Sequence, residues 1–224
     1  MAATYGDVMA RQPRWFTDTD DGHSQRYVER FRSMAADGAD LEGEARLVDA
    51  MTAPGSRVLD AGCGPGRTAG ALHRRGHRVV AVDVDPELIA AAEADHPGPH
   101  YVVADLSTLD LGEHAESEPF DAAVCAGNVL AFVAPDTEAD ALAAIRRHLL
   151  PDAFLVTGFH TDRYDLRDFD AHLTDADFVL ESRFATWDLR PWRVDADFAV
   201  SVLRVPATPT TDGTPAADPK ETPS

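Results

Sequence analysis

The chain has few cysteines and no long apolar run, and each of these features excludes a class of protein. The two cysteines, Cys63 and Cys125, lack the spacing of a disulfide framework or a zinc site, so a reduced, cytoplasmic protein is expected. No stretch approaches the roughly 18 apolar residues of a membrane span, so no membrane partner is expected. The segment from Met1 to Trp15 lacks the apolar core of a secretory signal peptide.

Lysine is also nearly absent, and basic residues as a group are scarce. The 20 basic residues face 39 acidic ones, which gives a formal net charge of −19, and Lys220 is the only lysine. A field of this sign repels the phosphate backbone of nucleic acids. We therefore expect no nucleic-acid partner.

The composition that remains is that of one globular domain with small attachments. The chain has 224 residues, of which 44% are hydrophobic and 26% charged. Residues 1–40 are predicted to form a helical N-terminal segment with a helix over His23–Ala36. Residues 41–205 form the main domain, which opens with a helix over Leu41–Met51. Residues 206–224 consist largely of Pro, Thr, Ala and Asp, and are expected to be a disordered tail.

Strands and helices alternate through the main domain. This alternation predicts parallel strands joined by right-handed crossovers, and hence a three-layer α/β/α sandwich. Two later runs, Phe178–Leu189 and Asp197–Val205, are predicted to be neighbouring antiparallel strands at one edge. The predicted parallel strands are Arg57–Asp60, Arg78–Val84, Tyr101–Ala104, Phe120–Ala126 and Phe154–Phe159. The predicted helices are Thr68–Arg75, Pro86–Asp95 and Glu138–Leu150, the last ended by Pro151.

A glycine-rich turn follows the first predicted strand. A phosphate-binding loop would need glycine at position 61 and lysine at position 67, where the chain has Ala61 and Arg67. A dinucleotide fingerprint built on Gly62 and Gly64 would need a small residue at position 67, and an arginine there would crowd the pyrophosphate. An NAD(P)-dependent oxidoreductase is therefore a disfavoured alternative.

The pattern Asp-x-Gly-x-Gly-x-Gly over residues 60–66 resembles motif I of the class I S-adenosylmethionine (SAM)-dependent methyltransferases, in particular small bacterial single-domain members. The resemblance covers about residues 41–205. It implies SAM as cofactor and a Rossmann-like, seven-stranded, mostly parallel sheet with an antiparallel edge strand. It also implies that the N-terminal segment contains the closing lid of the family.

Residues at three further strand ends fit this resemblance. Asp83 is placed to accept hydrogen bonds from both ribose hydroxyls, with Val84 beside it. The resemblance implies that Asp105 accepts from the adenine amino group, that Leu106 packs near the ring, and that the strand ending at Ala126 lies under the methionine moiety. The predicted cofactor-binding residues are Asp60, Gly62, Cys63, Gly64, Gly66, Arg67, Asp83, Val84, Asp105, Leu106 and Ala126.

Methyl transfer is an in-line displacement that depends mainly on alignment, and a hydroxyl acceptor adds the need for a base. His160, directly after the fifth strand, is the best-placed base, or else a solvated loop histidine. Asn128 is a candidate to orient the acceptor, or else fills a turn.

The residues after the fourth strand, Gly127 to Leu130, lack the [DN]-P-P-[YFW] motif of nucleobase and glutamine methyltransferases. A small-molecule acceptor is therefore predicted, with oxygen favoured as the methylated atom and nitrogen possible.

Acceptor contacts are expected from residues 15–30 and 160–164. These segments carry cations and aromatic rings that suit an anionic or aromatic acceptor, unless the arginines only pair with nearby aspartates.

A SAM-binding regulatory protein without turnover remains an alternative function. The protein is expected to be a monomer or a homodimer. No metal site is predicted, because the glycine in Asp18–Gly22 is misplaced for a calcium loop and the acid-rich Asp162–Asp177 is expected to be a solvated face.

Overall fold

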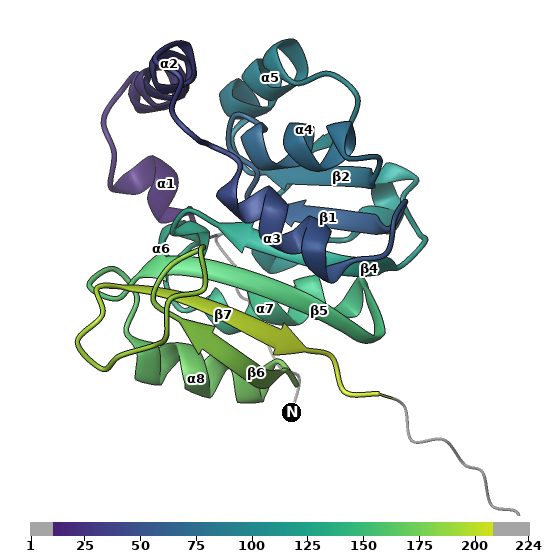
Figure 1. The fold of residues 1–224 in the computed structure, drawn as a ribbon. Coiled ribbons are helices and arrows are strands. Elements are labelled where there is room, and N and C mark those ends of the chain that lie inside the picture. Colours follow the sequence, from purple (N-terminus) through teal and green to yellow (C-terminus); the bar gives the residue numbers. More distant parts are fainter. Residues whose placement is uncertain (1–10, 208–224) are drawn as a thin grey trace, which may run out of the picture.

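The computed structural model describes residues 11–207. In this part of the chain, seven strands form one sheet in the order β3-β2-β1-β4-β5-β7-β6 (Figure 1). The first five run parallel to one another, while β7 is antiparallel to both of its neighbours. Strand β6 is therefore the edge strand, and the antiparallel strand β7 lies next to it. The strands are β1 Arg57–Ala61, β2 Arg78–Asp83, β3 His100–Val103, β4 Phe120–Ala126, β5 Leu149–His160, β6 Val179–Phe184 and β7 Phe198–Arg204.

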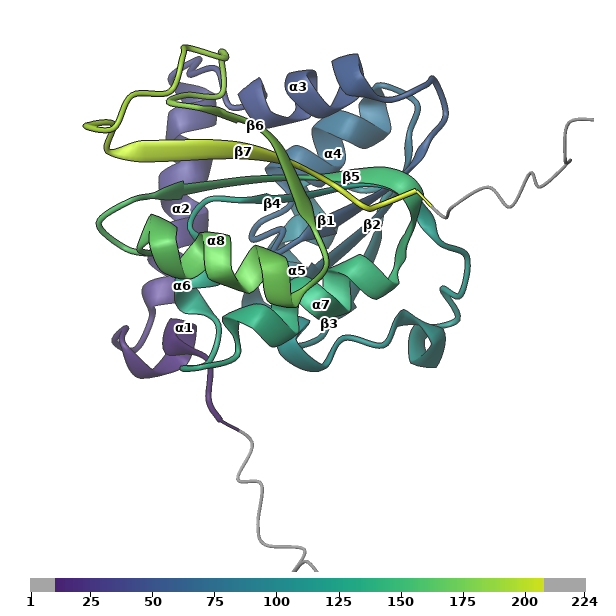
Figure 2. The ribbon, with the colours of Figure 1, turned by 90° about the horizontal axis from the view of Figure 1, so that it is seen from below.

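Helices cover both faces of the sheet, because successive strand residues point to opposite sides. Val58 packs in the core under α3 (Gly43–Met51) and α4 (Arg67–Arg74), while its neighbour Leu59 belongs to the core under α7 (Glu138–Arg147) and α8 (Leu166–Asp175). Figure 2 shows these two pairs of helices on opposite sides of the strands. The α5 helix, Pro86–Asp95, packs beside β2 and β3. The three-layer α/β/α sandwich is therefore confirmed.

Short helical segments gather at the carboxyl ends of the parallel strands. The α1 helix (Arg14–Thr17) and α2 (His23–Ala36), purple in Figure 1, lie beyond these strand ends, and α6 (Val129–Phe132) follows β4 directly. Of the two 3₁₀ turns that follow β3, Leu111–His114 lies beside His148 at the start of β5, whereas Leu106–Thr108 lies at the carboxyl ends. In open α/β sheets this edge is where ligands bind.

Most predicted elements are confirmed, but two boundaries were wrong. The strand expected over Phe178–Leu189 is β6, Val179–Phe184, because the chain turns after Phe184. The helix expected to run to Leu150 ends at Arg147, and Leu149 instead opens β5 by pairing with Phe120 in β4. Pro151 lies where the register of this pair shifts, a position that tolerates proline because the ladder is interrupted there. The pairing of Leu149 with Phe120 overrides the helical propensity of Leu149 and Leu150.

The acid-rich segment Asp162–Asp177 contains a helix that the sequence analysis did not predict. The helix, α8, buries Phe169 and Leu173 against the sheet and exposes its acids. The short α1 and α6 were also missed.

None of the helices in residues 11–207 is long and apolar enough to cross a membrane. Most of the predicted tail, 206–224, lies outside the described residues.

Candidate active site

The glycine turn brings the end of β1 close to β2 and α6. Gly62, Gly64 and Gly66 all have positive φ angles, of 81°, 54° and 81°. The N–H groups of Gly62 and Cys63 both donate to the carbonyl oxygen of Val82, at 2.8 and 2.9 Å. A Cβ atom at position 62 would lie 2.3 Å from a methyl group of Val129, so only glycine fits there.

Asp83 at the end of β2 holds this turn in place. Its Oδ2 atom accepts a hydrogen bond from the Gly64 N–H at 2.8 Å, and Oδ1 accepts one from the Asp85 N–H at 3.0 Å. Burial raises the pKa of the Asp83 carboxyl to about 6, against the lowering effect of these N–H donors. Each carboxylate oxygen has a second lone pair for a ligand. The geometry is compatible with the predicted ribose contact.

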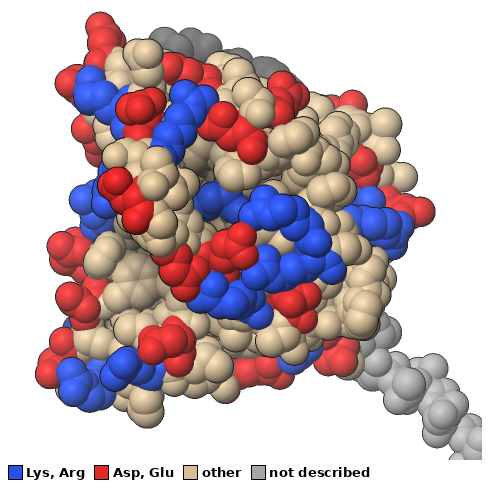
Figure 3. Space-filling model, turned by 45° about the horizontal axis from the view of Figure 1, so that its top comes forward, with Lys and Arg blue, Asp and Glu red and all other residues tan. Residues whose placement is uncertain are grey.

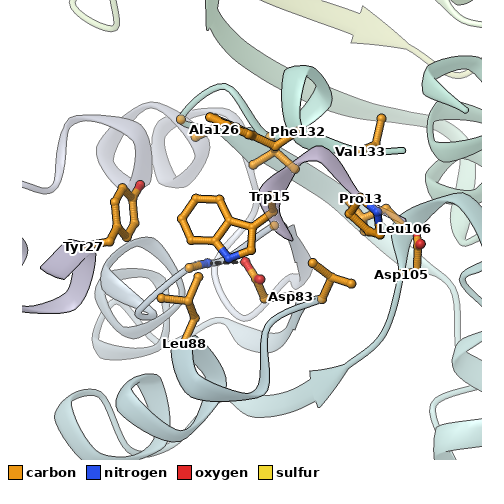
Figure 4. A pocket seen from close by; sticks show the side chains of 15 residues that line it. Pro13, Trp15, Tyr27, Asp83, Leu88, Asp105, Leu106, Ala126, Phe132 and Val133 are labelled. Atoms are coloured by element: carbon orange, nitrogen blue, oxygen red, sulfur yellow. Dashed lines mark hydrogen bonds between the residues drawn. The ribbon is translucent and has the colours of Figure 1, made fainter. Parts of the chain in front are cut away.

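One cavity runs along the carboxyl ends of β1 to β4. In Figure 4, Asp105 and Leu106 lie at one end, Tyr27 lies at the other, and Trp15 lies between them over Asp83. Asp105 uses its Oδ1 atom to accept from the N–H and hydroxyl of Ser107. The predicted residues Gly62, Gly64, Asp83, Val84, Asp105, Leu106 and Ala126 line this cavity, together with Pro13, Trp15, Tyr27, Leu88, Gly127, Val129, Phe132 and Val133.

A second, smaller cavity lies on the other side of the glycine turn and holds three more of the predicted residues, Asp60, Cys63 and Arg67. The Oδ2 atom of Asp60 is buried and has no hydrogen-bond partner among the described residues. Burial raises the pKa of this carboxyl to about 7, opposed by the nearby Arg67 guanidinium and the Ala69 N–H. Gly66 lines neither cavity.

Arg67 faces the second cavity while tying α4 to α3. Its guanidinium donates to the carboxylate of Glu44, at 2.7 Å for one of two bonds, and to the carbonyl oxygen of Leu41 at 2.9 Å. An unpartnered acid and a guanidinium across one small cavity suit a group with both an ammonium and a carboxylate. The methionine end of SAM is such a group, and the first cavity suits its adenosine end, so the residues present fit this cofactor.

The N-terminal segment closes the larger cavity from above. The Trp15 indole Nε1 and the Ser24 hydroxyl both donate to Oδ2 of Asp85, the former at 2.7 Å. Arg14 donates to Glu138 at 2.7 Å, which ties α1 to α7. Sequence reasoning missed Asp85, Pro13, Leu88, Phe132 and Val133; only Asp85, which directly precedes the helix predicted to start at Pro86, carried a local signal.

Neither predicted catalytic residue lines either cavity. Asn128 has a positive φ of 66°, and its side-chain oxygen accepts a hydrogen bond from the His160 N–H at 2.7 Å. The exposed His160 ring packs edge-on against Phe198, with 4.9 Å between centroids. The structure thus brings the two residues together but places neither of them in the lining of the two cavities.

The arginines expected to contact the acceptor lie outside the cavity as well. Arg26 forms an exposed ion pair with Asp20, and the Arg163 guanidinium lies 5.8 Å from the Phe132 ring centroid. Figure 3 shows arginine and acidic side chains intermingled over one face of the protein. Other ion pairs of this kind join Glu42 to Arg74 and Arg75. In these pairs the arginines neutralise nearby acids.

The mostly parallel sheet, the glycine turn and the carboxylates at successive strand ends define a nucleoside-binding α/β protein. A family model described as a methyltransferase domain matches residues 58–152. The crystal structure of a TehB-like SAM-dependent methyltransferase from Corynebacterium glutamicum shares 42% sequence identity, with a TM-score of 0.77 and coverage of 82% of this chain and 98% of that chain. The chain therefore belongs to the class I SAM-dependent methyltransferases, the family that its motifs resemble, whose cofactor is SAM.

Two curated relatives extend this comparison. Magnesium-protoporphyrin O-methyltransferase of Rhodobacter capsulatus is 32% identical over 150 residues, which are 61% of this chain and 63% of that protein. Ubiquinone biosynthesis O-methyltransferase of Xanthomonas campestris is 30% identical over 121 residues, or 48% of this chain and 50% of that protein. The chain thus matches only about half to two thirds of the length of these relatives.

Proposed function

We propose that this protein transfers the methyl group of SAM to an oxygen atom of a small-molecule acceptor. The observation that carries the proposal is the pair of cavities on the two sides of the glycine turn, one lined by Asp83 and Asp105 and the other by Asp60 and Arg67. The names of the two curated relatives, both O-methyltransferases, support oxygen as the reacting atom.

When bound, SAM supplies an electrophilic methyl carbon whose leaving group is a neutral thioether. The residues of this chain would bind and orient rather than exchange protons with it. Asp83 would accept from the ribose hydroxyls, Asp60 would accept from the ammonium group, and Arg67 would donate to the carboxylate. Trp15 and Phe132 would exclude water from the reacting atoms, since both rings line the cavity.

The covered cavity supports a small acceptor. Trp15 packs edge-on against Phe132 with 5.5 Å between ring centroids, and both residues line the larger cavity. A macromolecular substrate would have to displace α1 together with the ion pair between Arg14 and Glu138. The two buried, unpaired cysteines, Cys63 and Cys125, support a reducing compartment such as the cytoplasm as its location.

A binding test separates this proposal from a nicotinamide-dependent activity. SAM at about 100 times its dissociation constant is expected to stabilise the fold by about 2.7 kcal/mol, and NAD to have no effect. The measurement is a thermal-shift series with both ligands. A shift with NAD and none with SAM would contradict the proposal.

A turnover test separates an enzyme from a SAM-binding regulatory protein. Small carboxylic acids, phenols and amines are incubated with SAM carrying a labelled methyl group, and labelled product is followed by mass spectrometry. Label on an acid or a phenol supports O-methyl transfer, and label only on amines would contradict the choice of oxygen. Tight SAM binding with no labelled product from a broad acceptor panel would favour the regulatory protein.

A further inference from the structure

The two cavities share four lining residues: Tyr27, Gly62, Gly64 and Ala126. If the adenosine and methionine ends of SAM occupy one cavity each, the sulfur and its methyl group fall where the cavities meet. Three of the four shared residues have no side chain beyond Cβ. Tyr27 alone brings a functional group to this junction.

The Tyr27 ring is held in a fixed orientation from the lid side. It packs edge-on against Trp15, with 5.4 Å between centroids, and against Phe31, with 5.0 Å. A Cβ built at Gly64 would lie 3.6 Å from the Tyr27 ring, and one at Gly127 would lie 4.0 Å from its hydroxyl. The phenol thus lies between the glycine turn and the end of β4, on the opposite side of the cavity from Asp105 (Figure 4).

The hydroxyl of Tyr27 is available to a ligand. No hydrogen bond links it to another residue within 11–207, whereas the hydroxyls of Tyr101 and Tyr164 bond to His96 and His172. Burial raises the pKa of the Tyr27 phenol, so this group stays protonated at neutral pH. A protonated phenol donates a hydrogen bond but does not take up a proton.

We propose that the Tyr27 hydroxyl donates a hydrogen bond to the reacting oxygen of the acceptor, and that this oxygen arrives deprotonated, as a carboxylate or an acidic phenol. The inference rests on the proposed methyl transfer. The acceptor oxygen forms a bond to the methyl carbon while the bond between that carbon and sulfur breaks. The electron pair of the broken bond stays on sulfur, and Tyr27 keeps its proton.

This assignment removes the need for the base that His160 was predicted to supply. A base is needed only if the nucleophile must lose a proton during the reaction. A deprotonated acceptor needs an oriented donor instead, and the junction provides one.

The kinetic test compares Tyr27→Phe with Tyr164→Phe, using benzoate, 4-nitrophenol and benzylamine as acceptors and labelled SAM as donor. Tyr27→Phe keeps the ring packing and removes only the hydroxyl. We expect kcat with benzoate or 4-nitrophenol to fall tenfold or more in Tyr27→Phe, while the dissociation constant of SAM changes less than twofold. Tyr164→Phe, which removes a hydroxyl outside both cavities, is the matched control and should keep its kcat. Unchanged kcat in Tyr27→Phe, or methylation of benzylamine alone, would overturn the assignment.

An acceptor-free measurement keeps the inference testable if none of these probes is methylated, an outcome that counts against the proposed function. The protein is labelled with 3-fluorotyrosine, and Tyr27→Phe assigns the Tyr27 signal in the ¹⁹F spectrum. SAM and its demethylated product S-adenosylhomocysteine differ only by the methyl group and the charge on sulfur. We expect the Tyr27 signal to differ between the two complexes while those of Tyr101 and Tyr164 coincide. Identical Tyr27 signals in both complexes would overturn the placement of its hydroxyl at the methyl group.

Discussion

The indole of Trp15 donates a 2.7 Å hydrogen bond to Asp85, the residue that caps the N-terminus of α5. The Ser24 hydroxyl donates to the same oxygen, Oδ2, while the other oxygen accepts from the Glu87 N–H at 2.8 Å. One buried carboxylate therefore caps a helix of the sheet domain and fastens the segment that covers the cavity.

Asp85→Asn should weaken the attachment of the N-terminal segment to α5 while it keeps the cap of this helix. The amide oxygen can still accept from Glu87, but the amide nitrogen cannot accept from Trp15 or Ser24. Leaving these donors unpaired is expected to cost about 1–3 kcal/mol of unfolding free energy. Urea unfolding measures the loss, and limited proteolysis should cut within residues 11–36 more readily. Asp20→Asn, which breaks only an exposed pair with Arg26, should change stability by less than about 1 kcal/mol. Equal stabilities of the two variants would contradict the role of Asp85.

Asp83→Ala should weaken both SAM binding and the fold. The ribose hydroxyls would lose a charged acceptor worth about 1.5–3 kcal/mol, which corresponds to a tenfold or greater loss of affinity. The Gly64 and Asp85 N–H groups lose their acceptor in the same variant, so the unfolding free energy should also fall. Calorimetric titration and urea unfolding measure the two effects. Asp110→Ala, which removes an exposed cap away from the cavities, should keep SAM affinity. Unchanged affinity in folded Asp83→Ala would remove this residue from the site.

The carboxyls of Asp60 and Asp83 should each lower the unfolding free energy of the ligand-free protein as the pH rises from about 4 to about 7. Burial raises the pKa of Asp60 from 3.8 to about 7 and that of Asp83 from 3.8 to about 6. Between these values the folded state binds more protons than the unfolded state, so the unfolding free energy falls with increasing pH. Urea midpoints across this window should decline less steeply in Asp60→Asn than in the wild type. Parallel profiles for the two proteins would show that Asp60 does not titrate as described.

SAM affinity should change with pH in the opposite direction. A ligand with positive charge favours the deprotonated carboxylates, so binding releases protons and tightens as the pH rises through about 6 to 7. Titration calorimetry in buffers of different ionisation enthalpy measures the protons released. Zero release near pH 6 would contradict the placement of Asp60 beside the ammonium group.

Gly62→Ala and Gly55→Ala separate backbone strain from crowding. Both glycines have positive φ, 81° and 78°, so alanine should cost about 1–2 kcal/mol at either position. Only at position 62 does the new Cβ meet another group, the Val129 side chain, because nothing lies within 4 Å at position 55. Gly62→Ala should therefore destabilise more in urea and reduce SAM affinity, whereas Gly55→Ala should bind SAM normally. The idea of a crowded turn fails if both variants lose the same stability.

The part of the site that is local in sequence could be predicted, since backbone chemistry alone specifies it. The glycine turn needs positive φ at three positions, and Asp83 and Asp105 follow apolar runs that end at one edge of a parallel sheet. These signals require no knowledge of which distant segments meet. The five parallel strands and the helices α4, α5 and α7 were predicted for the same reason, whereas α6 and α8 were missed.

The rest depends on contacts between distant segments. Tyr27 precedes the glycine turn by a long stretch of chain, and nothing in residues 23–36 distinguishes its ring from that of Phe31, which lies in the same helix. The direction of His160 is set by the pairing of β5 with β7, which places its ring against Phe198. The end of α7 was misplaced because Leu149 pairs with Phe120, a residue far earlier in the chain.

The position of β7 between β5 and β6 has a consequence for synthesis of the protein on the ribosome. Strand β6 precedes β7 in the chain, yet within residues 11–207 it joins the sheet only through β7. At about 5–20 residues per second, β7 emerges roughly a second or more after β6. Until then β5 presents an unpaired, apolar edge, the kind of edge that other nascent chains and chaperones bind. Folding of this domain therefore ends with the addition of β7, and of β6 through it, to the edge of β5, and a chain that stalls before Phe198 leaves that edge unpaired.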